Sequence, residues 1–276
     1  MRKIKTPSNK QILAICVLMF IALNTANAQK QPQIQEISMR APDNVKIDGK
    51  LNEWPNKFLN AYNSTNRIYY VISNDDSNLY LTVRGLGNGV AKKMLAGGMT
   101  LTISHATRKQ NLAKAAENVA VTFPVPQDAK ITADIMGTIN QLFNYLDDSV
   151  ANRGQIDPII SKANRLINNA MKEIGVVGIK AIPDSVISIY NTEGIKAAAQ
   201  FIQVQPVIEL AIPLKYLGLS IDDQAKFSYN IKLSEIPVQS MSVNPNTISS
   251  VNPSPNNGYA FNATDFWGEY TLAKKP

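Results

Sequence analysis

The amino-acid sequence predicts a mainly β protein, a β-sandwich interrupted by an α-helical hairpin. Two observations carry this prediction. Short runs in which apolar and polar residues alternate are separated by Gly, Pro, Asn, Asp and Ser, which is typical of strands in a sandwich. Helical periodicity is confined to one block, about residues 132–175, and this argues against a fold in which strands and helices alternate.

The first 28 residues have the pattern of a secretory signal peptide. Four basic residues precede the apolar run Ile12–Leu23, and Ala26-Asn27-Ala28 follows as a cleavage site. The run of twelve residues is too short to cross a bilayer as a helix. We therefore expect residues 29–276 to be exported, to the periplasm or the medium, without a membrane span; an uncleaved anchor is the alternative. The single cysteine, Cys16, belongs to the signal, so the mature chain forms no disulfide.

The net charge of +7 partly reflects this signal. Residues 1–28 carry four of the 28 basic residues and no acidic one, which leaves 24 basic against 21 acidic side chains, or +3. No stripe of Lys and Arg remains in the mature chain, so a nucleic-acid partner is not expected.

The strands of the first half follow from period-two patterns. Residues 67–73 and 79–84 flank the turn residues Asn74–Asn78 and are expected to form a hairpin, the second strand being half-buried. Residues 99–105 and 119–123 are the next two strands. After the helices we expect six further strands: 176–182, 186–190, 195–203, 207–212, 227–233 and 268–272. Between the last two, residues 237–257 are rich in Pro, Asn and Ser and are expected to form a long loop.

The helical block has two amphipathic segments. In the first, apolar residues recur at three- and four-residue steps from Ile135 to Val150. Asp157-Pro158 is typical of a helix start, the stripe continues to Ile174, and Gly175 suits the C-terminal cap. These apolar stripes are expected to pack on each other and on the sheet; a surplus apolar face would instead be an interaction site.

Four short motifs, in this order, resemble the family 9 carbohydrate-binding modules and the related DOMON-like domains. They are Ile47-Asp48-Gly49 followed by Trp54, the hairpin Asp75–Tyr80, the strand Ile208–Leu214 with Glu209, and Asp265-Phe266-Trp267-Gly268. The resemblance implies one jelly-roll-like antiparallel sandwich over residues 29–276, in a group whose members bind sugars or, in some relatives, haem. The middle strand, residues 99–104, lacks the acidic residues of the sugar binders, and the chain is more similar to uncharacterised exported proteins of Gram-negative bacteria.

Exposed aromatic rings are the expected ligand contacts. Tyr259 and Phe261 follow the long loop, where binding residues are common. One of Tyr69 and Tyr70 must face outward, and Tyr70 is taken as the contact. Trp267 could stack on a sugar ring, although a tryptophan this close to a strand is more often part of the core, as is also expected of Trp54.

Haem and calcium are the cofactors considered. His105, the single histidine, could ligate haem together with Met94 or Met99, but no haem attachment motif is present and a strand-end role is the alternative. Asp48, Asp75 and Asp76 could bind calcium, although turn chemistry explains them equally well.

No catalytic motif is present, and glycoside hydrolysis would need two opposed carboxylates, for which Glu209 and Glu235 are the candidates. The sequence therefore predicts a non-enzymatic, exported module that binds carbohydrate through exposed aromatic residues. The alternatives are a cell-envelope accessory protein that binds another protein through the helices or the long loop, and a haem-binding domain.

Overall fold

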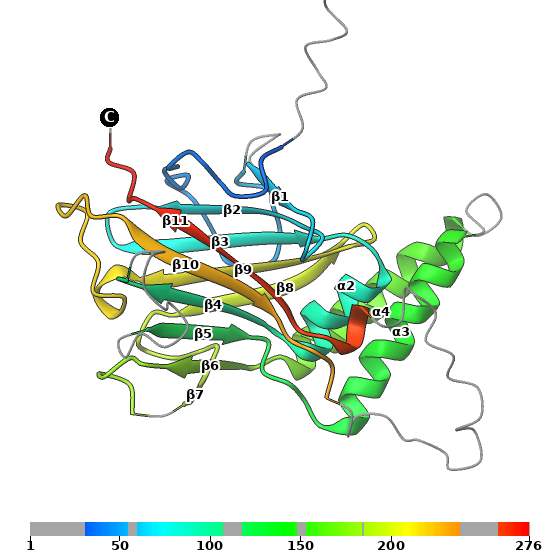
Figure 1. Ribbon diagram of the computed structural model, residues 1–276. Helices are drawn as coiled ribbons and strands as arrows, with labels where there is room; N and C mark the ends of the chain where they lie inside the picture. The colour runs from blue at the N-terminus through cyan, green and yellow to red at the C-terminus, as the bar shows by residue number, and fades with distance from the viewer. Residues whose placement is uncertain are drawn as a thin grey trace, which may run out of the picture. The chain divides into compact units, whose positions relative to one another are not determined.

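Two antiparallel β-sheets pack face to face in the computed structural model, which describes residues 31–54, 60–106, 118–147, 153–183, 185–237 and 259–275 (Figure 1). The five-stranded sheet has the order β1 (Ala61–Asn63), β2 (Ile68–Asn74), β3 (Asn78–Gly85), β9 (Gln205–Pro213), β8 (Lys196–Ile202). The six-stranded sheet has the order β11 (Thr264–Tyr270), β10 (Phe227–Leu233), β4 (Met99–Ser104), β5 (Val119–Phe123), β6 (Glu173–Val177), β7 (Val186–Ser188). The predicted β-sandwich is confirmed. The predicted signal peptide and residues 238–257 of the predicted loop lie outside the described residues.

The core lies between the sheets and follows the predicted alternation. On β4, Met99, Leu101 and Ile103 are buried, whereas the threonines between them are half-exposed. Across the core, the Tyr70 hydroxyl of β2 lies 2.9 Å from the Tyr229 hydroxyl of β10. The two phenols share a hydrogen bond, so the polar atoms that the sandwich buries here have a partner.

The outer face of the five-stranded sheet is covered as well. Apolar residues of the segment 39–54 pack on it, with Trp54 against Val71 and Ala41 against Tyr80. The prediction of a half-buried β3 is therefore wrong, because Tyr80 and Thr82 on its outer side are 7% and 1% exposed. The covering segment is a third layer, and the period-two pattern does not reveal it.

The helical hairpin is confirmed with different bounds. Helix α3 spans Ala129–Asp147 and α4 spans Arg153–Ala170, so α4 begins before Asp157 and contains Pro158. The predicted end at Gly175 is wrong, because residues 173–177 form β6 and Gly175 pairs with Thr122 of β5. The apolar residues near the junction fit a helix and a strand equally well, and pairing with β5 decides between the two.

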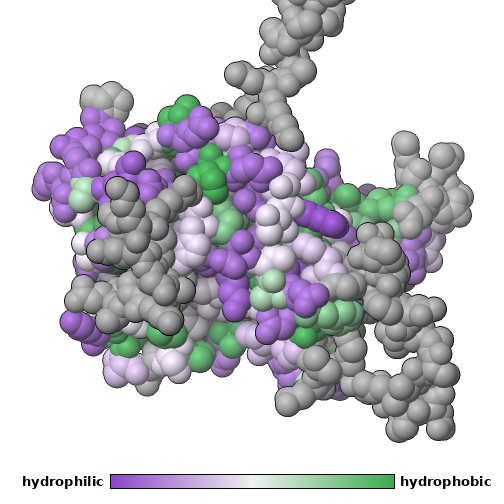
Figure 2. Space-filling view, viewed as in Figure 1, coloured by the Kyte–Doolittle hydropathy of each residue, from purple (hydrophilic) through white to green (hydrophobic). Residues whose placement is uncertain are grey.

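The apolar stripes of α3 and α4 are used inside the protein. Ile135, Ile139 and Leu142 of α3 are buried, as are Ile159 and Ile167 of α4. The Asn164 side chain of α4 also accepts from the Phe201 N–H at 2.7 Å and donates to the Phe201 carbonyl at 3.1 Å, on edge strand β8. The large hydrophobic residues that are exposed within the described ranges lie elsewhere: Ile37, Val177, Val186, Tyr190 and Phe261. In Figure 2 the hydrophobic side chains form small separate patches among hydrophilic ones.

The two ends of the sandwich differ. Strands β4 and β6 both run antiparallel to β5, so their C-terminal ends lie together, and α3 and α4 connect β5 to β6 at the opposite end. We call the end with α3 and α4 the helical end; it also holds α2 (Asn88–Lys92), the π-helix η1 (Lys93–Gly97) and η6 (Tyr259–Phe261) (Figure 1). The opposite end, with the residues that follow β4, β6 and β9, is the loop end. No helix within the described ranges has the length and hydropathy needed to cross a membrane.

Candidate functional site: a basic cavity at the loop end

Two of the four short motifs, Ile47-Asp48-Gly49 with Trp54 and the strand Ile208–Leu214, meet around Glu209. This side chain is fully buried on the outer face of β9, where its Oε2 accepts from the N–H of Gly49 at 2.9 Å and of Asp48 at 3.3 Å. Burial raises the pKa of the Glu209 carboxyl to about 7, although the N–H groups of Gly49 and Trp54 favour its charged form. A side chain at Gly49, whose φ is +77°, would lie 2.9 Å from Gln200 Cγ. These residues thus hold the segment 39–54 on the sheet, and the core role predicted for Trp54, 6% exposed, is confirmed.

The three calcium candidates are engaged in turns and in two ion pairs, Arg40–Asp76 and Lys50–Asp48. Asp75 Oδ1 accepts from the N–H of Ser77 and Asn78, and Oδ2 accepts from the Tyr80 hydroxyl at 2.6 Å. Burial alone would raise the pKa of Asp75, but these hydrogen bonds outweigh it and the pKa is lowered. Asp76 pairs with Arg40 at 2.7 Å, and Asp48 accepts from the Lys50 N–H. Within the described ranges, no three His, Cys, Asp or Glu side chains are placed to hold a metal ion.

The four predicted aromatic contacts do not converge. Tyr70 is fully buried, so the outward position predicted for it is wrong, and its neighbour Tyr69 is the half-exposed ring, 4.8 Å from Tyr62. Trp267 is half-buried on the outer face of β11, paired with Asn230 of β10. Phe261, 37% exposed, lies at the helical end in η6.

Tyr259, a preferred contact from the sequence, is half-exposed and lies in a cluster with two cations. Lys93 Nζ lies 4.2 Å from the centre of its ring and Arg67 Cζ 4.6 Å, while its hydroxyl donates to the Thr65 carbonyl at 3.1 Å. Lys93 is fully buried and donates to Thr264 Oγ1 at 2.6 Å. Burial lowers the pKa of the Lys93 ammonium to about 8; nearby Glu235 opposes this shift and Arg67 adds to it.

His105 lies at the exposed end of β4, where its Nε2 donates to the Leu217 carbonyl at 2.8 Å. Met99 begins the same strand, and six residues of strand place it ~20 Å away. Met94 and Met99 are both fully buried. His105 and Met99 therefore cannot ligate one haem iron, and the strand-end alternative describes the position of His105.

A cavity of about 350 Å³ opens beside His105 at the loop end. Its walls come from three loops, one after β4, one after β6 and one around η3 (Leu214–Tyr216), which follows β9. The lining residues are His105, Val119, Gly178, Ile179, Lys180, Ala181, Lys215, Tyr216, Leu217 and Gly218. The Tyr216 ring is half-exposed, with the Lys215 ammonium 4.8 Å from its centre.

Sequence reasoning found His105 but neither Tyr216 nor the two lysines of the cavity. Gly218 explains part of the geometry: its φ is +62°, and a Cβ there would lie 3.2 Å from His105 Nε2. The available signal was the Leu214–Gly218 stretch that follows Pro213, a turn at the end of a buried strand, where loops commonly carry function.

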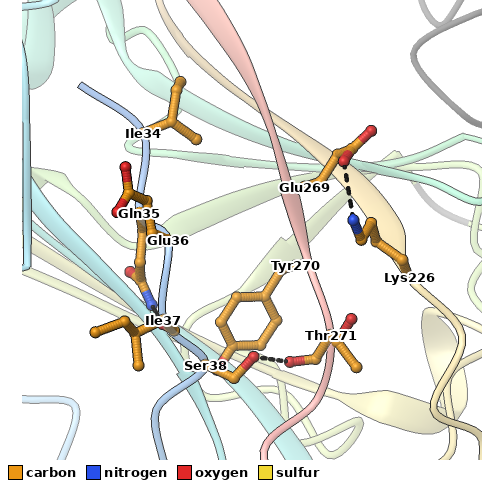
Figure 3. Close-up of a pocket in the computed structure, with 9 residues that line it drawn as sticks. All are labelled: Ile34, Gln35, Glu36, Ile37, Ser38, Lys226, Glu269, Tyr270 and Thr271. Atoms are coloured by element: carbon orange, nitrogen blue, oxygen red, sulfur yellow. Dashed lines mark hydrogen bonds and ion pairs between the residues drawn. The ribbon is translucent and has the colours of Figure 1, made fainter. Parts of the chain in front are cut away.

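A second hollow, of about 300 Å³, lies along β11 (Figure 3). It runs between residues 34–38 and the end of β11, where the Ser38 hydroxyl donates to the Thr271 carbonyl. Its one ring, Tyr270, is 4% exposed and donates its hydroxyl to the Met39 carbonyl. Its one cation, Lys226, pairs with Glu269 at 3.4 Å, and its remaining charged residue, Glu36, is acidic. This groove therefore offers a ligand no open ring face and no unpaired cation, unlike the cavity at the loop end.

Comparison of the chain with protein-family models, with curated proteins and with solved structures gave no match. The resemblance to family 9 carbohydrate-binding modules therefore stays a prediction from the motifs.

Proposed function

We propose that this protein is an exported, non-catalytic module that binds carbohydrate in the cavity at the loop end. The observation that carries the proposal is the cavity itself, about 350 Å³, with the half-exposed ring of Tyr216 beside hydrogen-bonding side chains. Small-molecule sites are concave, have volumes of ~300–1,000 Å³ and place a few polar groups around an apolar surface.

The chemistry of the lining suits a sugar. An aromatic ring stacks on the C–H face of a pyranose and loses little rotamer freedom. Lys180, Lys215 and the second ring nitrogen of His105, which has no partner among the described residues, are available to the hydroxyl groups of the sugar. The exposed Lys215 must leave the ring first, and its cation–π contact is worth only ~0.5–1 kcal/mol.

The absence of catalysis is part of the proposal. None of the ten residues that line the cavity is a carboxylate, and glycoside hydrolysis uses two. Glu209 is covered by the segment 39–54 in the five-stranded sheet, whereas Glu235 is exposed beyond β10 in the other sheet, so these two do not flank a common cleft. Export rests on the sequence of residues 1–28 alone.

The test is a binding screen of the purified protein against neutral and charged oligosaccharides, followed by titration calorimetry. Tyr216→Ala is expected to weaken binding at least ~10-fold because it removes the stacking surface. Tyr190→Ala is the matched control, since Tyr190 is 74% exposed and also has a lysine, Lys172, 5.3 Å from its ring centre. Binding that is unchanged in Tyr216→Ala, or no binding to any glycan by the folded protein, would refute the proposal.

A further inference from the structure

We propose that the cavity at the loop end selects an acidic carbohydrate, a glycan with carboxylate or sulfate groups, through Lys180 and Lys215. This inference rests on the proposed function and specifies its ligand class. The two lysines come from different loops, one after β6 and one in η3 after β9. A negative group inside the cavity would therefore have two ammonium groups of the lining to pair with.

The charge of the cavity is uncompensated. Both lysines are exposed, and neither pairs with a carboxylate among the residues that the structure describes, where the ion pairs are Arg40–Asp76, Lys50–Asp48 and Lys226–Glu269. The groove along β11 is the internal comparison, because its lysine is already paired with Glu269. Two like charges without counter-ions raise the local concentration of anions and favour an anionic ligand over a neutral one.

The remaining polar groups of the cavity would orient the ligand. A carbonyl oxygen only accepts, so His105 Nε2 carries the proton in its bond to the Leu217 carbonyl, and this bond holds the imidazole on the cavity wall. The ring of Tyr216 lies next to Lys215, with the ammonium 4.8 Å from the ring centre. A sugar stacked on this ring would have its substituents within reach of the displaced ammonium, so stacking and charge pairing act on one residue of the glycan.

The experiment compares one oligosaccharide backbone in neutral, carboxylated and sulfated forms, with inorganic sulfate as a non-sugar anion, at low and high salt. The wild type is expected to bind an acidic form at least ~10-fold more tightly than the neutral one, with the difference shrinking at high salt. Lys180→Gln/Lys215→Gln is expected to lose this preference. Lys196→Gln/Lys274→Gln, two exposed lysines outside the cavity, is expected to keep it. Thermal melting of both variants should match the wild type, since all four side chains are exposed.

The outcomes separate the two proposals. Equal binding of neutral and acidic glycans overturns the inference and leaves the carbohydrate function standing. Inorganic sulfate that binds as tightly as the acidic glycans, in competition with them, overturns the carbohydrate function, since the site is then a general anion site. No binding of any glycan overturns both. A preference for the acidic form that persists in Lys180→Gln/Lys215→Gln overturns the assignment to these lysines.

Discussion

The two ends of the sandwich each bring a lysine to a half-exposed tyrosine ring, but the lysine is buried at one end and exposed at the other. At the helical end, Tyr259 lies beneath Lys93, which is fully buried, and its hydroxyl is hydrogen-bonded to Thr65. At the loop end, Tyr216 lies beneath the exposed Lys215 on the wall of an open cavity. The same pair of residue types is therefore part of the buried structure in one place and, in our proposal, part of a binding surface in the other, and the exposure of the lysine makes the difference.

The largest expected effect is on stability when each ring is removed. Tyr259→Ala should lower the free energy of unfolding by ~2–4 kcal/mol, because it deletes half-buried ring contacts and leaves the Lys93 ammonium without its ring. Tyr216→Ala should cost less, ~1 kcal/mol, since the Lys215 ammonium that loses its ring is exposed and stays hydrated. Urea denaturation of the two variants measures both values, and equal losses would contradict the distinction between a ring paired with a buried lysine and one paired with an exposed lysine.

Lys93 should also make the stability of the protein depend on pH. Its pKa is lowered to about 8 in the folded protein against 10.5 for an unperturbed lysine, so between these values the unfolded state binds more protons. Stability is therefore expected to rise as pH increases from about 8 toward 10.5. Lys93→Met should remove this rise in a series of melting curves, whereas Lys215→Met should leave it in place. A rise that survives in Lys93→Met would assign it to another group.

Glu209 extends the comparison to a buried charge of opposite sign. Its pKa is raised from 4.5 to about 7, so over that range the folded state binds more protons than the unfolded state. The stability that Glu209 contributes is complete below pH 4.5 and is lost as pH rises through 7. Glu209→Gln should flatten this part of the stability profile, and Glu36→Gln, at an exposed glutamate, is the control. Chemical denaturation at about pH 5 and about pH 8 gives the free energy of unfolding on either side of this transition, and the difference should shrink in Glu209→Gln but not in the control.

Much of the fold was predictable because alternation and turn residues act locally. Val119–Phe123 and Phe227–Leu233 have the predicted bounds, and the helical hairpin was found as one block. Tertiary contacts decided the rest: pairing of β6 with β5 overrides the helical spacing at Ile174, and the segment 39–54 buries the outer side of β3. A local sequence pattern does not indicate contacts between segments that are distant in the sequence.

The candidate site was less predictable than the fold. The conspicuous motifs at Gly49 and Glu209 meet each other in a buried structural contact, so they describe how the sandwich is held together. Tyr216 and Lys180 lie 36 positions apart in the sequence and come from loops of different sheets. Only the packing of the two sheets brings them to one cavity, which is why ordinary residues in ordinary turns gave no signal.

The smallest expected effect on stability is that of Lys215→Met, and this variant distinguishes a role in stability from a role in binding. Lys215→Met keeps much of the apolar stem and removes the charge. It should change the free energy of unfolding by less than ~0.5 kcal/mol, since an exposed lysine has no buried charge to lose. The same change should weaken binding of an acidic glycan about fivefold, the effect of one charge pair worth ~1 kcal/mol. Melting curves and calorimetry on the same preparation measure both. If Lys215→Met lowered the free energy of unfolding as much as Tyr259→Ala, Lys215 would have a structural role, and the loop end would have to bind its ligand without it.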